Sequence, residues 1–174
     1  MEVSHRGLAT LIAGQRDHLD CGPESVVLQV ASPAFDLMVL ELTTAMDAGA
    51  RLVVAAPDAF AGVPLAMTIA DGGVTHVLIT PTVLGTLDPA MVPGLTTVFT
   101  GGEACPEELA HTWGARRRFL NGYGPSEFTI WATVDGPIEA GNRVTIGRPL
   151  TGVRALVRDR GLRPTPPGAV AYTH

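Results

Sequence analysis

Lysine is missing from this 174-residue sequence, whose basic side chains are twelve arginines scattered along the chain. The formal net charge is −5, so the broad basic surface that drives nucleic-acid binding is missing as well. We therefore expect no nucleic-acid partner. Any reaction that depends on an ammonium side chain would have to obtain it from outside this sequence.

Cysteine is scarce, and long apolar runs are absent. Cys21 and Cys105 stand alone, without the paired spacing of a zinc site. No stretch approaches the roughly 18 uninterrupted apolar residues of a membrane span, and the first residues lack a signal-peptide pattern. We expect a cytoplasmic protein with no membrane contact.

The sequence does contain short β-branched or apolar runs that alternate with segments of helical length, in a chain that is 46% apolar. This alternation is typical of parallel strands joined by crossover helices, and it predicts an α/β fold with an open, mostly parallel sheet and flanking helices. The predicted strands are Val26–Val30, Leu52–Ala55, His76–Ile79, Thr96–Thr100 and Arg117–Leu120, and the predicted helices are Phe35–Ala48, Pro64–Asp71, Thr82–Leu87, Pro106–Trp113 and Ser126–Thr133.

The pattern changes near Asp135, where short possible strands alternate with Gly and Pro turns. We expect residues 1–134 to form the α/β unit and residues 135–174 to form the start of a β-rich segment. Ala169–Tyr172 is predicted to be one of its strands.

Three turns directly follow predicted strands: Ser32–Asp36 (SPAFD), Thr100–Ala104 (TGGEA) and Asn121–Glu127 (NGYGPSE). Ligands of open parallel sheets bind at the carboxyl ends of the strands, so these turns should share one rim. Gly101 and Gly102 would allow a flat ligand to approach the backbone, although a tight turn would also explain them.

The NGYGPSE turn has the side chains of a nucleotide site. Tyr123 lies between two glycines and could act as a stacking surface, and the Asn121 amide could pair with a base edge. Ser126 begins a predicted helix, whose free N–H groups favour a phosphate. Glu127 is either an acid of the first helical turn or a ligand for a hard divalent cation.

Asp36 also has two readings. As an acid at a helix start it would contribute about 0.3–1 kcal/mol through the helix dipole. As a functional residue it would be a half-buried carboxylate beside an apolar run, and it would pair with a cation. The pattern alone leaves both open.

A series of motifs then carries a family resemblance. In order they are VSHRGL, SPAFD, ITPT, TGGEACP, NGYGPSE and IGRPL followed by LRPTPPG. From Val3 to about Val170, the sequence resembles the amino-acid-activating adenylation domains of nonribosomal peptide synthetases. The resemblance implies a flavodoxin-like core subdomain that helps to activate an amino acid with ATP as aminoacyl-AMP, for transfer to a phosphopantetheinyl carrier protein.

The same resemblance implies residue roles, with Asp36 paired to the substrate's α-ammonium group. The specificity pocket would comprise Leu37, Leu40, Leu78, Phe99, Gly101, Gly122, Ile130 and Trp131. The nucleotide would contact Gly102, Glu103, Ala104, Asn121, Tyr123, Gly124 and Ser126, and Glu127 would help to hold Mg²⁺.

The implied pocket has no charged side chain, so we expect a substrate with a neutral, apolar side chain. Phe99 and Trp131 suggest limited room, and Gly101 and Gly122 should reopen some of it. The expected range runs from glycine to a small aliphatic residue, because a single methylene gives only about 1–3 kcal/mol of discrimination.

The resemblance covers only part of the family's length. The family's first subdomain, its phosphate loop and its C-terminal subdomain with an essential lysine have no counterpart in these 174 residues. We therefore expect the remaining subdomains to be partners, and the chain alone to lack a complete catalytic set, to bind neither ATP nor Mg²⁺, and to have negligible activity.

Two alternatives remain open. One is a fragment of an aryl- or acyl-CoA ligase, whose substrates have no α-ammonium group and would not need an acid at Asp36. The other is a non-catalytic flavodoxin-like module that binds a nucleotide, since one fold supports many functions.

Overall fold

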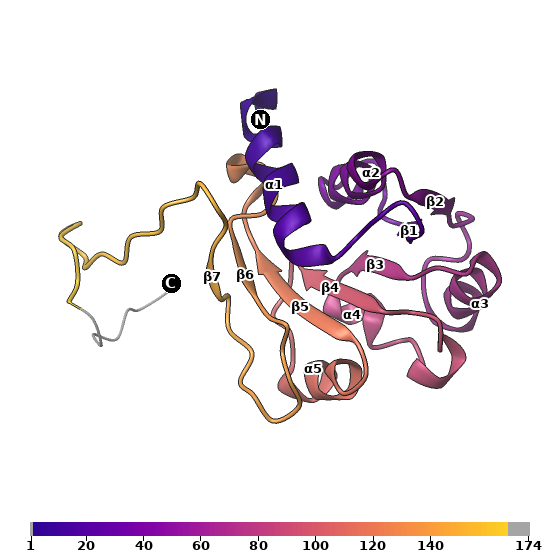
Figure 1. Ribbon diagram of the computed structural model, residues 1–174. Helices are drawn as coiled ribbons and strands as arrows, with labels where there is room; N and C mark the ends of the chain where they lie inside the picture. The colour runs from indigo at the N-terminus through magenta and orange to yellow at the C-terminus, as the bar shows by residue number, and fades with distance from the viewer. Residues whose placement is uncertain (1, 167–174) are drawn as a thin grey trace.

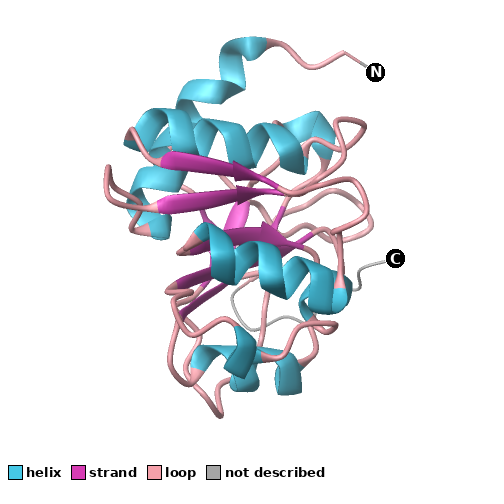
Figure 2. Cartoon of the chain, turned by 90° about the vertical axis from the view of Figure 1, so that its right-hand side faces the viewer, coloured by secondary structure: helices cyan, strands magenta, loops and turns pink. Residues whose placement is uncertain are grey.

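A computed structural model describes residues 2–166, and its centre is one seven-stranded sheet with helices on both faces (Figures 1 and 2). The spatial order of the strands is β2-β1-β3-β4-β5-β6-β7. Neighbours among the first five are parallel, and β6 and β7 are added antiparallel. The strands are β1 (Val26–Gln29), β2 (Arg51–Val54), β3 (His76–Ile79), β4 (Thr97–Gly101), β5 (Arg118–Tyr123), β6 (Thr133–Asp135) and β7 (Arg148–Pro149).

This order confirms the open, mostly parallel sheet predicted from the sequence, and the order 2-1-3-4-5 is that of flavodoxin-like folds. The helices are α1 (Leu8–Leu19), α2 (Leu37–Ala48), α3 (Gly62–Gly72), α4 (Pro81–Leu84) and α5 (Glu107–Gly114), with 3₁₀ turns η1 (His5–Gly7), η2 (Pro89–Met91) and η3 (Ser126–Phe128).

The two faces of the sheet carry separate hydrophobic clusters, because successive strand residues point to opposite sides. Val98 and Phe119 pack with residues of α3, α4 and α5. Phe99 and Leu120, their neighbours in sequence, pack with residues of α1 and α2. The helix pair α1 and α2 therefore covers the face that carries Phe99.

Helix α1 was not predicted. Its middle contains Gly14, which normally disfavours a helix. In the structure a Cβ at this position would lie 2.8 Å from a methyl carbon of Leu150, so the glycine permits close packing of α1 against the segment after β7.

The predicted helix Ser126–Thr133 is wrong. Only the three-residue turn η3 forms, and Thr129 and Ile130 then take left-handed backbone conformations with φ of 60° and 75°. Ser126 therefore does not begin a helix whose dipole could bind phosphate. Strand β5 also runs further than expected, so that Asn121, Gly122 and Tyr123 belong to the strand.

Beyond β7 the described chain extends away from the body of the protein (Figure 1). Its regular pairing consists of one bridge between Arg158 and Pro164. The expected division at residues 134 and 135 falls inside β6, and it stays a prediction. The predicted strand Ala169–Tyr172 lies outside the described residues.

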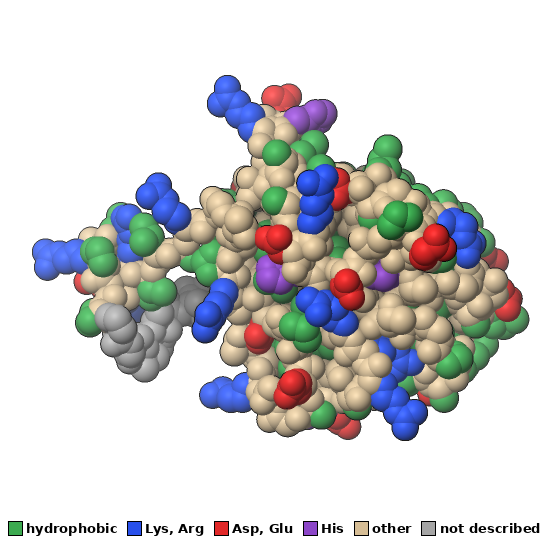
Figure 3. All heavy atoms as spheres, in the orientation of Figure 1, with side chains coloured by type: hydrophobic (Ala, Val, Ile, Leu, Met, Phe, Trp, Pro, Cys, Tyr) green, Lys and Arg blue, Asp and Glu red, His purple; other side chains and the backbone are tan. Residues whose placement is uncertain are grey.

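The face of the molecule shown in Figure 3 has arginine and acidic side chains interspersed among uncharged ones. Across residues 2–166, none of the helices combines the length and apolar character needed to span a bilayer.

Candidate functional site

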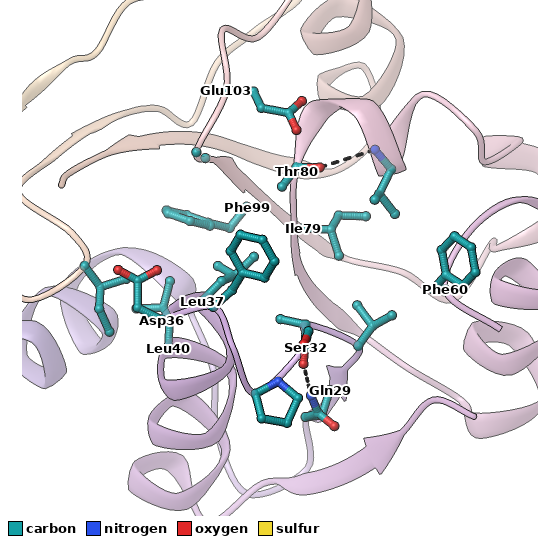
Figure 4. Close-up of a pocket in the computed structure, with 18 of the residues that line it drawn as sticks. Gln29, Ser32, Asp36, Leu37, Leu40, Phe60, Ile79, Thr80, Phe99 and Glu103 are labelled. Carbon is teal, nitrogen blue, oxygen red and sulfur yellow. Dashed lines mark hydrogen bonds between the residues drawn. The ribbon is translucent and has the colours of Figure 1, made fainter. Parts of the chain in front are cut away.

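A cavity of about 850 Å³ follows the carboxyl ends of the five parallel strands. It crosses the point between β1 and β3 where the strand order reverses, which is where open α/β sheets bind ligands. In Figure 4, Asp36 and Phe60 lie at opposite ends of this cavity, with Leu37 and Phe99 near Asp36.

Asp36 immediately precedes α2, but its carboxylate does not cap the helix. Its backbone carbonyl accepts the Val39 N–H at 2.9 Å, while its side-chain Oδ2 accepts a hydrogen bond from the Ser126 hydroxyl. The turn after β1 and the turn after β5 therefore meet at this carboxylate. This contact brings together two motifs that are 90 residues apart in the sequence.

The aromatic rings of Phe99 and Trp131 close one end of the cavity. The rings pack edge to face, with centroids 4.8 Å apart, and the Trp131 indole N–H donates to the Thr133 carbonyl at 2.7 Å. Both side chains are 3% exposed. We call Leu40, Phe99, Gly122 and Trp131 the closed end of the cavity.

Gly122 does not provide the extra room that was expected of it. A Cβ on this residue would overlap the Phe99 ring and would lie 2.8 Å from Trp131 Nε1. The space above the glycine is therefore already filled by aromatic side chains. The expectation that Gly122 reopens the pocket is wrong, because the Phe99 ring occupies the space that the glycine leaves on β5.

The cavity gathers most of the residues predicted for amino-acid recognition. Leu78 is the exception, because it is 1% exposed in the core and does not line the cavity. The predicted residues that do line it are Asp36, Leu37, Leu40, Phe99, Gly101, Gly122, Ile130 and Trp131.

The predicted nucleotide residues are divided between the cavity and the surface beside it. Gly102, Glu103 and Gly124 line the cavity. The Glu103 carboxylate accepts hydrogen bonds from the N–H and hydroxyl of Thr82, which ties the turn after β4 to the start of α4. The members that lie outside the cavity lining are Ala104, Asn121, Tyr123, Ser126 and the predicted metal ligand Glu127.

The Asn121 side chain is engaged within the protein. Its Nδ2 donates to the Thr145 carbonyl at 2.7 Å, and its Oδ1 accepts from the Thr100 hydroxyl at 3.4 Å. Asn121 is 7% exposed. This arrangement differs from the predicted contact with a base edge, because the amide holds the segment before β7 against the sheet.

Tyr123 lies at the end of β5 with 52% of its surface exposed. Its ring is thus available as a flat surface beside the cavity. Glu127 is also exposed, and residues 2–166 contain no cluster of three or more His, Cys, Asp or Glu side chains suited to a metal ion. We call Gly102, Glu103, Ala104, Tyr123 and Ser126 the open rim.

Glu41, which the sequence did not single out, does not line the cavity itself but binds two residues that do, Val30 and Ala31. This carboxylate on α2 is 0% exposed and accepts hydrogen bonds from the Val30 and Ala31 N–H groups, each at 3.1 Å. Burial raises its pKa from 4.5 to about 7, against the lowering effect of these hydrogen bonds. One signal was present in the sequence, since Glu41 is the only acid between Leu37 and Met46.

The protein belongs to the AMP-binding enzyme family, whose model matches residues 1–171. Novobiocin biosynthesis protein H of Streptomyces niveus is 42% identical over 164 residues, which are 94% of this chain and 27% of that protein. The chain thus spans about a quarter of this relative's length.

Solved structures agree with this family. The Vibrio cholerae adenylation domain AlmE, in complex with glycyl-adenosine-5'-phosphate, superposes with a TM-score of 0.75 at 29% identity, covering 84% of this chain and 30% of that one. A four-domain nonribosomal peptide synthetase bound to AMP and glycine gives a TM-score of 0.81 at 26% identity, over 95% of this chain and 13% of that one. These findings confirm the resemblance to synthetase adenylation domains.

Proposed function

We propose that this protein forms the amino-acid-recognition part of an adenylation domain that activates an amino acid with ATP as aminoacyl-AMP. The observation that carries the proposal is the position of Asp36. This carboxylate lines a largely apolar cavity at the strand-order reversal and is hydrogen-bonded to Ser126 of the NGYGPSE motif. A carboxylate there can pair with the α-ammonium group of an amino acid while the apolar residues beside it receive the side chain.

The substrate we propose has a small, neutral side chain, in the range from glycine to a small aliphatic residue. Support comes from the closed end, where the Phe99 ring occupies the space above Gly122 and packs against Trp131. A side chain that extended into the space above Gly122 would have to displace this buried ring. The two structural neighbours described above hold glycyl-adenosine-5'-phosphate and glycine, which is consistent with this range.

For the nucleotide, we propose that Tyr123 stacks on the adenine and that the backbone of Gly102, Glu103 and Ala104 frames it, with Gly124 as a further contact from the cavity lining. Ser126 would contact the phosphate from its 3₁₀ turn rather than from the start of an α-helix. The exposed Glu127 would help to hold Mg²⁺, which usually binds through one or two carboxylates together with substrate phosphates and water. A multi-residue metal cage is therefore not required.

We further propose that the remaining adenylation subdomains and a phosphopantetheinyl carrier protein are the partners of this chain. Alone, the chain should show negligible ATP–pyrophosphate exchange. Positioned charges that stabilise the transition state supply orders of magnitude in rate, and these 174 residues have no counterpart of the family's phosphate loop and essential lysine. The free thiols of Cys21 and Cys105 fit the cytoplasmic setting that we propose.

A segment exchange tests this function. Residues 2–166 would replace the corresponding segment of a complete adenylation domain, and ATP–pyrophosphate exchange would be measured against all common amino acids. We expect exchange with glycine or alanine above all others. Exchange that prefers aspartate or lysine would contradict the pocket assignment, and a preference for carboxylic acids without an amino group would favour an acyl-CoA ligase.

A further inference from the structure

Glu41 is a fully buried acid whose hydrogen bonds all go to one short segment of the chain. Its Oε1 accepts the N–H groups of Val30 and Ala31 at 3.1 Å each. Its Oε2 accepts the Ala31 N–H and the Gln29 side-chain amide, both at 3.3 Å. Gln29, Val30 and Ala31 are the residues at which β1 ends, and all three line the cavity.

These backbone groups need such a partner. β1 ends at Gln29, and among residues 2–166 no backbone carbonyl accepts a hydrogen bond from the N–H group of Val30 or Ala31. A buried N–H without an acceptor costs about 1–3 kcal/mol. The Glu41 carboxylate supplies both acceptors from α2, ten to eleven residues further along the chain.

The segment that Glu41 holds leads directly to the site. Only Ser32–Phe35 separate it from Asp36, and Asp36 is followed at once by α2, which carries Glu41. The carboxylate thus closes a loop from the end of β1 to the second turn of α2. Figure 4 shows Gln29, Ser32 and Asp36 along this loop, bordering the cavity.

Within residues 2–166, Glu41 forms no ion pair with a charged side chain. The influences on the pKa of Glu41 are burial and its hydrogen bonds, with no ion pair among them. Charged and titratable groups on the packed helices and strands have other partners: Asp47 on α2 pairs with Arg16 of α1, Arg51 on β2 donates to Gly72, and His76 on β3 contacts the Leu19 and Asp20 carbonyls.

We propose that Glu41 is a positioning residue for amino-acid recognition, which fixes the path of the loop that brings Asp36 into the cavity. The proposal rests on the function proposed above for Asp36. When Glu41 is charged, its oxygens accept both N–H groups. When it is protonated, one oxygen becomes a donor that faces donors, and the loop loses part of its anchor.

Hydrogen exchange on the chain itself provides the first test. At pH 8, where the wild-type carboxyl is largely charged, we expect the amides of Val30 and Ala31 to lose protection by about tenfold or more in Glu41→Gln, since one acceptor oxygen is replaced by a donor NH₂ group. The matched control is Thr44→Val, which changes another buried polar residue on α2 whose hydroxyl donates to the Leu40 carbonyl. Equal protection of these two amides in both variants would overturn the proposal.

The second test uses the grafted adenylation domain and separates the KM for the amino acid from the KM for ATP. At pH 8 we expect Glu41→Gln to raise the amino-acid KM by about tenfold and to change the ATP KM by less than about twofold, whereas Thr44→Val changes neither KM. At pH 6 the difference between wild type and Glu41→Gln should shrink, because the wild-type carboxyl is then largely protonated.

The outcomes distinguish the two proposals. If the wild-type graft exchanges with glycine but Glu41→Gln behaves like Thr44→Val, the role of Glu41 is wrong and the proposed function stands. If the wild-type graft is folded and exchanges with no amino acid, the proposed function is wrong, and the role of Glu41 falls with it.

Discussion

The closed end of the cavity and the open rim differ in how they are built. The closed end consists of side chains that belong to the core, with Leu40 at 1% exposure and Phe99 and Trp131 at 3%. At the rim, Tyr123 is 52% exposed and Ser126 lies in a short 3₁₀ turn. The closed end is therefore fixed by the packing of the sheet against α2, while the rim is an open surface.

Under the proposed function, the two parts would divide two tasks, selection of the amino-acid side chain and binding of the nucleotide. Selection of a substrate's side chain needs a rigid pocket, and the close-packed interior of a protein is rigid. For the nucleotide base, the recognition that we propose uses an exposed ring and backbone groups, which would leave one side of the ligand uncovered. The difference can be tested at each end, beginning with the change of largest expected effect.

Phe99→Ala should have that largest effect. The ring is buried against Trp131, and deleting a buried phenylalanine side chain typically costs about 3–5 kcal/mol of unfolding free energy. In the grafted domain the vacated space should shift exchange from glycine toward larger aliphatic amino acids. Urea denaturation of the chain and an amino-acid panel would measure the two effects. A large stability loss with an unchanged substrate preference would show that Phe99 is core but not pocket.

Glu41 should make the free energy of unfolding depend on pH. Its pKa is raised from 4.5 to about 7, so the folded state binds this proton more tightly than the unfolded state. The contribution of Glu41 to the free energy of unfolding should therefore be greatest below about pH 4.5 and should fall as the pH rises to about 7, by roughly 2–3 kcal/mol.

The measurement compares wild type with Glu41→Gln by denaturation at several pH values between 5 and 8. Relative to wild type, the variant should gain stability as the pH rises through this range. Parallel curves would mean that Glu41 titrates far below pH 5.

Gly122→Ala sharpens the description of the closed end. The added methyl group would collide with the Phe99 ring, and overpacking of this kind typically costs about 1–3 kcal/mol. In a Phe99→Ala background the same change should cost less, since the collision with the ring is gone and the contact with Trp131 Nε1 remains. Denaturation of the four proteins of this double-mutant cycle gives the coupling. Additive costs would show that the two residues do not share this space.

The sequence was sufficient to predict the parallel sheet, because β-branched runs such as His76–Ile79 carry their own signal. The sequence was not sufficient where contacts between distant parts of the chain determine the local structure. Helix α1 contains Gly14, whose packing against Leu150 cannot be read locally, and the segment after Ser126 bends through left-handed residues instead of continuing as a helix.

The candidate site shows the same division. The motifs predicted which residues gather at the strand ends, and most of the expected pocket residues line one cavity. The filling of the space above Gly122 depends on the register that sets β4 against β5, with Gly101 opposite Gly122. The role of Glu41 was hidden because its partners are backbone groups, which every residue possesses.

Tyr123→Ala should have the smallest effect on stability, within about 0.5 kcal/mol, because the ring is exposed. Stacking of a base on an aromatic ring contributes about 1–3 kcal/mol, so the ATP KM of the grafted domain should rise by about tenfold. Phe128→Ala is the matched control, since Phe128 is 48% exposed and has no proposed role. Equal ATP KM values in the two variants would count against stacking on Tyr123.

The most direct test of the central claim compares glycine with acetate, which lacks the ammonium group, in grafted domains with Asp36 or with Asp36→Asn. If Asp36 pairs with the α-ammonium group, wild type should strongly prefer glycine. The variant should lower the ratio of kcat/KM for glycine to that for acetate by about a hundredfold or more, since breaking a buried charge pair typically costs about 3–5 kcal/mol. An unchanged ratio, with both substrates slowed alike, would contradict the claim.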